Sequence, residues 1–535
     1  MNKAKLHIKV LSALIAIASL TVISGGCRKD DSPAKVVPFE RLLTKQTYYS
    51  KLLHRDMSYA VLLPDGYDKS DVSYPVVYLL HGYGDDETAW YTGGNIRFYV
   101  DKYSSDIAPM IYVMPEAFNT YYVNKYNGKY PMMDVLVDEL VPAIDSIYRT
   151  KADRTHRAVM GYSMGGYGAL ILPVMNPGIF SVSVSLSMSF RTDQQYMAES
   201  QDAFNSQWAP NFGGTGYSGE SRLTDYFLQH SPFHFFNAAN ASQYNDLKMF
   251  FDCGDDEESL SKTNDSLHCL MREAAIDHQY RVRNGAHTWS YWYGALHDAL
   301  VYIDDAMKGI DYPADSEPAT ETPHIQSGDI INTVIGNTGY NMNVLLPPGY
   351  DGSSDSYPVI YILNDTLSEA RNNCVVSLFS VLRNAMLSGS LARSLVVEMK
   401  APSAGGESML TAAVAQTDAS FRTLQLQGRR VLIADNNAGT IVSELTGPSA
   451  LLFDSFFMFD AKNNGSSQEV YAPLFYYLDI TDKGNNYASY YGLNLKLRAE
   501  DIDCEYRVRQ GSASYQSFVN GVSSSMYYLN KRIKE

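Results

Sequence analysis

The chain has few cysteines, no excess of basic residues and, beyond its N-terminus, no long apolar run. The five cysteines in 535 residues show no metal-ligand spacing, so Cys253, Cys269, Cys374 and Cys504 are expected to be buried free thiols. Lysine and arginine number 43 against 59 aspartates and glutamates, and this net charge of -16 argues against nucleic acid, whose phosphates would be repelled. We expect no metal, no cofactor and no membrane-spanning helix.

What is present describes a globular protein of more than one domain. Hydrophobic residues make up 45% of the chain and charged residues 19%, which is too apolar for a disordered protein. A length of 535 residues allows two or three domains, each with its own core.

The N-terminus has the pattern of a secretory signal. Lysines at positions 3, 5 and 9 precede an apolar stretch over residues 10–22, which is too short to span a bilayer. The following segment, 23–27, resembles a bacterial lipoprotein cleavage box in which Cys27 is lipidated, although Ser24 replaces the usual aliphatic residue. The alternative is an ordinary secretory signal with an incidental cysteine.

The residues after Cys27 extend this prediction to a location. Arg28-Lys29-Asp30-Asp31 resembles the short tag that directs lipoproteins of Bacteroidetes-type bacteria to the cell surface. We therefore expect a signal peptide over 1–27 and a tether over 28–39. The protein would then be anchored in the bacterial outer membrane through its lipid alone.

The chain is organised around Gly161-Tyr162-Ser163-Met164-Gly165-Gly166. An apolar strand over 157–160 precedes this segment and a helix-forming stretch over 167–172 follows it, which is the context of a nucleophile elbow. The tight turn would expose Ser163 Oγ, and the Met164 N–H would point from a helix N-terminus toward a developing oxyanion. We predict that Ser163 is the catalytic nucleophile.

A second oxyanion donor is expected after the buried strand over 75–80. This strand ends in His81-Gly82-Tyr83-Gly84, a glycine-rich loop that lets a backbone N–H approach the substrate. We assign the donor to the Tyr83 N–H and expect a structural role for His81.

The acid and the base follow in the chain order serine, acid, histidine. A strand over 248–252 leads into the acidic loop that carries Asp256 and Glu257, where an acid would accept the histidine Nδ1–H. His287 follows the strand over 279–283 and precedes an amphipathic helix, a setting that suits a general base.

Aromatic residues supply candidate substrate contacts. Residues 189–246 interrupt the alternation of strands and helices and are expected to form a cap beside the active site. We predict Trp208, Trp289 and Trp292 as substrate-binding residues, while most of the cap's aromatic rings would form its own small core.

These segments resemble the esterase D and feruloyl esterase type of α/β-hydrolase, carbohydrate esterase family one. The resemblance rests on His81-Gly82, Gly161 to Gly166, Cys253-Gly254, and Gly285-Ala286-His287 with Trp289. It implies the α/β-hydrolase fold, with a mostly parallel sheet flanked by helices, and the hydrolysis of acetyl, feruloyl or other small esters, often on plant xylan. Relatives carry aspartate three residues after the strand-end glycine; Glu257 stands there in this chain, so Asp256 remains the alternative acid.

The second half repeats the first. Three segments match in order: 344–351 with 61–68, 356–363 with 73–80, and 506–511 with 280–285. We expect a catalytic domain over 40–312, a linker over 313–327 and a second, degenerate α/β-hydrolase-like domain over 328–535.

The second copy lacks the catalytic groups. Asn364-Asp365 replaces His81-Gly82, Asn436 or its neighbour replaces the serine, Lys483-Gly484 replaces the acid and Ala513 replaces the histidine. This copy should not hydrolyse esters, and it either binds glycan or braces the first domain. Because all three catalytic residues precede residue 312, we expect a chain that ends there to keep its turnover number.

The predicted function is serine ester hydrolysis, removing acetyl or feruloyl groups from a xylan-type polysaccharide. An acyltransferase or peptidase could use the same triad, because fold and triad do not determine the acceptor. A surface glycan-binding lipoprotein with a vestigial hydrolase fold is the alternative from another class.

Overall fold

A computed structural model describes residues 40–313, 315, 324–364, 377–425, 430–445, 447–462 and 475–534. The predicted signal peptide with Cys27, the predicted tether, and Cys374 and Asp365 lie outside these ranges. Of the described cysteines, Cys253 is buried, and Cys269 and Cys504 are free and partly buried. Within the described ranges, no helix combines the length and apolar character needed to cross a membrane.

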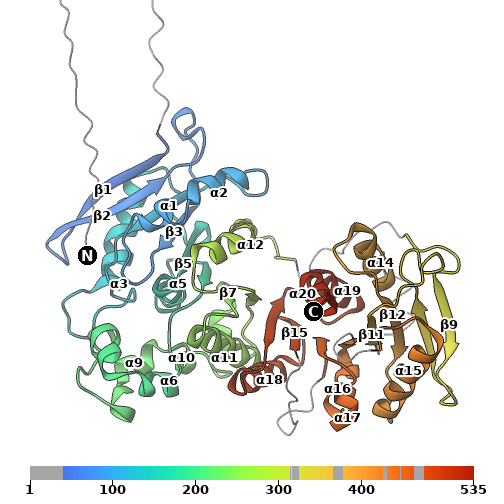
Figure 1. Ribbon diagram of the computed structural model, residues 1–535. Helices are drawn as coiled ribbons and strands as arrows, with labels where there is room; N and C mark the ends of the chain where they lie inside the picture. Colours follow the sequence, from blue (N-terminus) through green and yellow to red (C-terminus); the bar gives the residue numbers. More distant parts are fainter. Residues whose placement is uncertain are drawn as a thin grey trace, which may run out of the picture. The chain divides into compact units, whose positions relative to one another are not determined.

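The first copy builds eight strands of a sheet (Figure 1). They are β1 (Leu42–Ser50), β2 (Arg55–Leu62), β3 (Val76–Leu80), β4 (Ile111–Pro115), β5 (Arg157–Tyr162), β6 (Val182–Leu186), β7 (Lys248–Gly254) and β8 (Gln279–Arg283). Their order in the sheet is β1-β2-β4-β3-β5-β6-β7-β8. Strands β1 and β2 are antiparallel to their neighbours, and β4, β3 and β5 to β8 run parallel. This is the mostly parallel α/β-hydrolase sheet that the sequence predicts.

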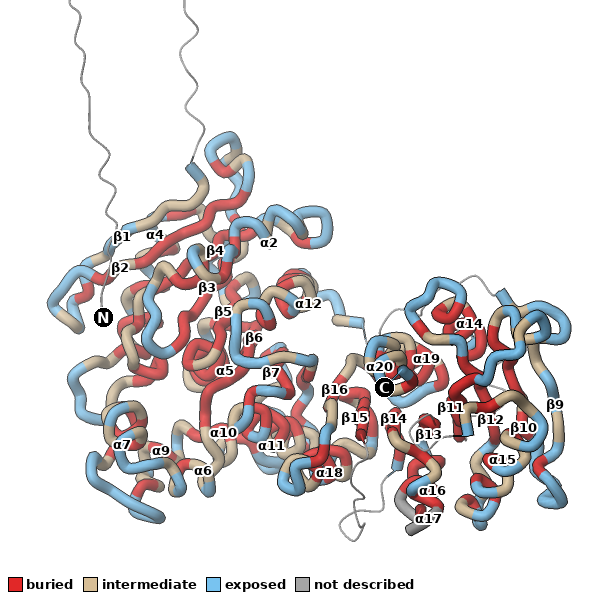
Figure 2. Tube along the Cα trace, in the orientation of Figure 1, coloured by how far each residue is buried: buried red, intermediate tan, exposed pale blue. Residues whose placement is uncertain are grey.

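Helices cover both faces of this sheet because its central strands are apolar on both sides. In β3, the side chains of Tyr78 and Leu80 join one core while Leu79 joins the other, as the period of two requires. The flanking helices are α1 (Ala89–Thr92), α2 (Ile96–Lys102), α3 (Met132–Asp134), α4 (Val141–Ile147), α5 (Met164–Met175), α11 (Ser259–Glu273) and α12 (Trp289–Lys308). The buried strands between exposed outer segments are visible in Figure 2.

The expected cap lies between β6 and β7. It consists of short helices: α6 (Asp193–Ala198), α7 (Gln201–Ala203), α8 (Ala209–Phe212), α9 (Asp225–His230) and α10 (Pro232–Phe235). Their aromatic rings pack on one another, so the cap has a core of its own.

The second copy has the same strand order as the first, read in the opposite direction across the sheet. Its strands are β9 (Ile330–Val334), β10 (Asn341–Leu345), β11 (Val359–Asn364), β12 (Leu395–Lys400), β13 (Arg430–Asp435), β14 (Ser455–Phe459), β15 (Phe475–Thr481) and β16 (Cys504–Arg509). Its helices include α14 (Leu378–Ser388), α15 (Gly406–Ser420), α16 (Gly439–Glu444), α17 (Gly447–Ala450), α18 (Tyr487–Ala499), α19 (Tyr515–Ser524) and α20 (Met526–Lys534). From β16 outward the order is β16-β15-β14-β13-β11-β12-β10-β9, which is the order of the first copy read from β8.

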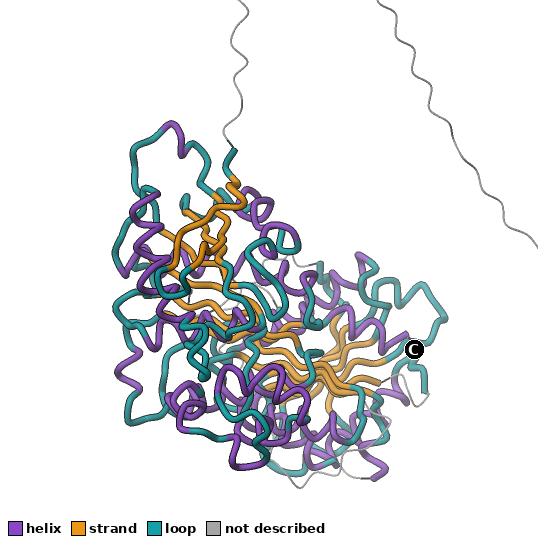
Figure 3. Tube along the Cα trace, turned by 90° about the vertical axis from the view of Figure 1, so that its left-hand side faces the viewer, coloured by secondary structure: helices purple, strands orange, loops and turns teal. Residues whose placement is uncertain are grey.

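The two copies meet strand to strand. β8 and β16 pair in antiparallel orientation, with Val282 opposite Val508, and this pairing joins the copies into one 16-stranded sheet. Figure 3 shows the strands as one layer between helices. On the face covered by α11 and α18, a single apolar core extends under both copies, whereas the opposite face has a separate core in each copy.

Two local features differ from the pattern expected along the chain. Strand β1 lies within a stretch that carried no strand prediction, because its polar residues, among them Lys45, Gln46 and Thr47, hide the alternation of exposed and partly buried positions that begins at Thr44. Between α3 and α4 the chain forms a π-helical segment over Val135–Leu140, where a continuous α-helix would be the ordinary conformation. Neither feature moves the end of β5, where the elbow begins.

Candidate active site

Ser163 occupies a strained turn between β5 and α5. Its φ of 58° and ψ of -121° are unusual for a residue with a side chain, and such strain is typical of functional positions. The turn is possible because a Cβ on Gly161 would lie 2.1 Å from the Gly165 carbonyl oxygen. The Ser163 N–H donates to the Leu186 carbonyl at 2.9 Å, which fixes the turn to the end of β6. Ser163 itself is partly exposed.

The two predicted oxyanion donors come from adjacent loops. Met164 opens α5, and Tyr83 lies in the loop after β3; neither backbone N–H donates to the described part of the chain. A Cβ on Gly165 would lie 2.2 Å from the Leu80 carbonyl oxygen, so the start of α5 packs directly against the end of β3. Both amides are therefore available at one edge of the sheet for an oxyanion.

Buried hydrogen bonds hold the Tyr83 loop in place. His81 is 1% exposed, its Nε2 accepts the Ala117 N–H at 3.1 Å, and its Nδ1 lies 2.8 Å from the Gly82 carbonyl. Asn119 Oδ1 accepts the Gly84 N–H at 2.7 Å. These contacts place His81 under the loop rather than beside Ser163, which agrees with the structural role expected for it. Asn119 was not expected from the sequence, since a lone asparagine in a loop carries no distinguishing pattern.

The predicted acid and the predicted base meet at the ends of β7 and β8. Glu257 Oε2 lies 2.6 Å from His287 Nδ1, a distance typical of a charge-assisted hydrogen bond. The Glu257 side chain is fully buried, whereas that of His287 is 36% exposed. Asp256 is exposed, and its backbone N–H binds the Gly285 carbonyl instead. Among the two candidate acids, Glu257 is the one whose carboxylate contacts the histidine.

Ser187 supports Glu257 from the end of β6. Its hydroxyl donates to Glu257 Oε1 at 2.5 Å and accepts the Trp292 Nε1–H at 2.8 Å, and the Gly254 N–H also donates to Oε1 at 2.9 Å. Ser187 has a φ of 48°, so a second strained residue lies next to the elbow. Ser187 carries no distinguishing signal in the sequence, because it ends a segment in which serines alternate with apolar residues, a pattern expected of a strand.

Two of the three tryptophans predicted to bind substrate have other roles, which corrects that prediction. Trp208 is fully buried and packs inside the cap, 4.9 Å from the Tyr121 ring between centroids. Trp292 is 4% exposed, and its ring lies 5.0 Å from that of His287, so it packs behind the base. Trp289 is partly exposed and lies edge-on to Tyr162 at 4.5 Å. Aromatic identity alone could not distinguish these environments.

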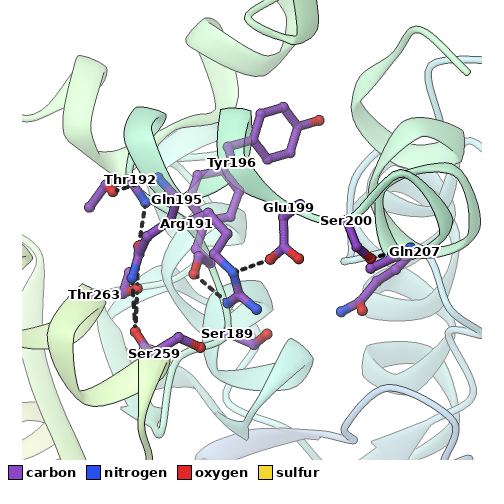
Figure 4. A network of polar contacts seen from close by, with 12 residues as sticks. Ser189, Arg191, Thr192, Gln195, Tyr196, Glu199, Ser200, Gln207, Ser259 and Thr263 are labelled. Atoms are coloured by element: carbon purple, nitrogen blue, oxygen red, sulfur yellow. Dashed lines mark hydrogen bonds and ion pairs between the residues drawn. The ribbon is translucent and has the colours of Figure 1, made fainter. Parts of the chain in front are cut away.

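A polar network joins the cap to the start of α11 (Figure 4). Arg191 Nε donates to Glu199 Oε1 at 2.5 Å, and the Arg191 guanidinium lies 5.1 Å from the Trp208 ring centroid. The Ser189 N–H binds the Ser163 carbonyl at 3.0 Å, and Gln195 Nε2 donates to the Ser259 carbonyl at 3.1 Å. The cap is thus attached both to the elbow and to the start of α11, directly after the loop that carries Glu257.

The second copy keeps the elbow's backbone without its chemistry. Asn436 has a φ of 39° at the position of Ser163, and the Lys462 N–H binds its carbonyl as the Ser189 N–H binds that of Ser163. Asp460, with a φ of 46°, takes the place of Ser187. The sequence offers no serine, acid or histidine at the three catalytic positions, so this copy cannot assemble a triad.

Comparisons with known proteins concern the first copy. A family model described as Esterase matches residues 50–303. An endo-1,4-beta-xylanase/feruloyl esterase of Xylanibacter ruminicola is 35% identical over 143 residues, which are 25% of this chain and 20% of that protein. An acetyl esterase of Caldicellulosiruptor saccharolyticus is 22% identical over 265 residues, 48% of this chain and 96% of that protein. The chain thus spans about a fifth of the length of the first of these relatives.

Solved structures cover the same half. A ferulic acid esterase is 28% identical, with a TM-score of 0.42, and covers 50% of this chain and 98% of its own. The family match begins at the end of β1 and ends within α12, so it includes the elbow, the Glu257 loop and the His287 loop. Residues 50–303 of this chain are therefore similar to the Esterase family, and the strands they contain have the order of the α/β-hydrolase sheet.

Proposed function

We propose that residues 40–312 form a serine esterase that removes acetyl or feruloyl groups from a plant-type polysaccharide such as xylan. The observation that carries this proposal is the 2.6 Å contact between Glu257 and His287, formed at the sheet edge that also holds the strained Ser163. Support for the substrate class comes from the relatives named feruloyl esterase and acetyl esterase.

The proposed reaction follows from the positions of these groups. His287 Nε2 takes the proton of Ser163 Oγ as the oxygen attacks the ester carbonyl, and Glu257 stabilises the imidazolium that forms. The Tyr83 and Met164 amides bind the negative oxygen of the tetrahedral intermediate. The sugar hydroxyl then leaves with the proton from His287, and a water molecule, activated by His287, hydrolyses the acyl-enzyme.

Turnover of a soluble chromogenic acetyl ester tests the chemistry. Ser163→Ala should lower kcat by roughly 10³-fold or more, because only oxyanion stabilisation and substrate binding would remain. Circular dichroism should show an unchanged fold. A folded variant that keeps more than a few per cent of the activity would refute the triad.

The substrate is tested with acetylated and feruloylated xylo-oligosaccharides. Release of acetate or ferulate from one of them supports the proposed class and identifies the acyl group. Binding of the oligosaccharides without release would instead favour the glycan-binding lipoprotein, and acyl transfer to an added alcohol in preference to water would favour an acyltransferase.

We also propose that the protein is held on the outer membrane through a lipid on Cys27. The support is the sequence pattern of residues 10–31. Metabolic labelling with a fatty acid should mark the full chain and not a Cys27→Ala variant, and equal labelling of both would contradict the anchor.

A further inference from the structure

The seam between β8 and β16 has an approximate two-fold axis. Val282 and Val508, which face each other across the antiparallel pair, occupy equivalent positions in the two copies. A surface that meets its own equivalent in this way is isologous, so each contact across it should occur twice.

Two buried ion pairs cross the seam, and they are equivalent under this axis. Arg281 of the first copy binds Asp482 of the second at 2.6 Å, and Arg507 of the second copy binds Asp255 of the first. Each aspartate also accepts a backbone N–H of the opposite strand at 3.3 Å, from Tyr280 or from Tyr506. Both aspartates are 1% exposed, so these charges depend on their partners for compensation.

The two ion pairs differ in the loops to which their aspartates belong. Asp255 lies two residues before Glu257, and its Oδ1 accepts the Gly285 N–H at 3.1 Å, two residues before His287. Its carboxylate thus connects the loop of the triad acid to the loop of the base. In the second copy Asp482 makes the same bond to the Gly511 N–H at 2.9 Å, but no acid or base follows it there.

We propose that Arg507, supplied by the second copy, is a positioning residue for the triad of the first. It fixes Asp255, and through Asp255 it sets the relative placement of Glu257 and His287. The second copy then supports catalysis by holding these two loops at the distance that the contact between Glu257 and His287 requires. This inference rests on the proposed esterase function.

The environment of Asp255 makes this support necessary. Burial raises the pKa of Asp255, while the Arg507 guanidinium and the Gly285 N–H oppose that rise. Without Arg507, the carboxylate would be buried with only backbone donors, and protonation or rearrangement of the loop would follow. On the face opposite α11 and α18, a cavity of about 720 Å³ borders Arg281 and Arg507, so apolar packing does not hold the strands there.

The seam therefore revises one expectation drawn from the sequence. A chain that ends near residue 312 keeps Ser163, Glu257 and His287 but loses Arg507. We now expect such a chain to have a lower turnover number, because the partner of Asp255 is missing.

The test compares two variants in the second copy of the full-length protein. Arg507→Gln breaks the ion pair with Asp255, and Asp482→Asn breaks the equivalent pair with Arg281, which supports no triad loop. Arg507→Gln should lower kcat by roughly 10- to 100-fold with little change in KM, as expected for a misplacement of catalytic groups by a fraction of an ångström to 1 Å. Asp482→Asn should leave kcat within about twofold of the unmodified enzyme.

A double-mutant cycle separates positioning from general destabilisation. If Arg507 acts through Glu257, adding Arg507→Gln to a Glu257→Gln variant should reduce kcat far less than it does in the unmodified protein. If Arg507→Gln does not fold, Arg507→Lys replaces it in both comparisons, because it keeps the charge but loses the guanidinium fork.

The outcomes distinguish this inference from the proposed function. An unmodified protein without esterase activity would refute the proposed function itself. An active protein in which Arg507→Gln and Asp482→Asn have equal effects on kcat, or in which the cycle is additive, would refute the role of Arg507.

Discussion

Ser187 gives the sharpest test of how the acid is held. Ser187→Ala removes the hydroxyl that donates to Glu257 Oε1 at 2.5 Å and leaves the Trp292 Nε1–H without its acceptor. A hydrogen bond to a charged group contributes about 1.5–3 kcal/mol. Because the Gly254 N–H stays on the same oxygen, the lower end of that range, about 1.5–2 kcal/mol, is the expected loss of transition-state stabilisation. This corresponds to a decrease in kcat of roughly 10- to 30-fold.

Ser187→Gly provides a matched control. It removes the same hydroxyl and also relieves the φ of 48°, which alanine would have to keep. Both variants should therefore lose similar amounts of kcat, while the glycine variant should be about 1 kcal/mol more stable to unfolding than the alanine variant.

The assay is steady-state turnover of a soluble chromogenic acetyl ester, with thermal unfolding of each variant followed in parallel. If Ser187→Ala keeps kcat within about threefold of the unmodified enzyme, Glu257 does not need this hydroxyl and the reasoning is wrong. If Ser187→Gly keeps the kcat of the unmodified enzyme while Ser187→Ala does not, loss of the hydroxyl is not the cause of the lower kcat.

Two further predictions concern the acid and the seam. Glu257→Gln should reduce kcat more than Asp256→Asn, since of these two residues Glu257 contacts His287. A larger decrease in kcat for Asp256→Asn would show that Asp256 is the triad acid. Burial lowers the pKa of His278 to about 4; its Nε2 lies 2.8 Å from His268 Nδ1, and Lys483 Nζ binds its carbonyl. His278 is therefore neutral in the folded protein and gains a proton on unfolding below about pH 6.5. Its contribution to the free energy of unfolding is present above that pH and is lost as the pH falls toward 4. Between pH 7 and 5 the unmodified protein should lose about 2 kcal/mol more of its free energy of unfolding than His278→Gln, measured by denaturant titration, and equal losses would contradict this.

The parts of the fold that could be predicted are those encoded locally. The apolar run that becomes β3, the glycine spacing around Ser163 and the alternation of strands and helices each depend on neighbours in the chain. The contact between Glu257 and His287 could be predicted because each residue follows a strand, and adjacent parallel strands bring their ends together.

The support of the site could not be predicted in this way. Ser187, Asn119 and Asp255 act through hydrogen bonds to residues far away in the sequence, and their types are common in loops. Trp208 shows the converse, because a conspicuous side chain is buried by packing that no local pattern specifies. The repeat itself was evident, but antiparallel pairing of β8 with β16 depends on a surface formed only after both copies fold.

A strand pair built from equivalent positions is also what joins the subunits of a symmetric homodimer. Here both partners belong to one chain, so their encounter is intramolecular and occurs at an effective concentration on the order of millimolar for a short linker. Association of β8 with β16 is then independent of how dilute the protein is, unlike that of an obligate dimer. At low protein concentration this interface would stay intact, and neither copy would depend on finding a second molecule.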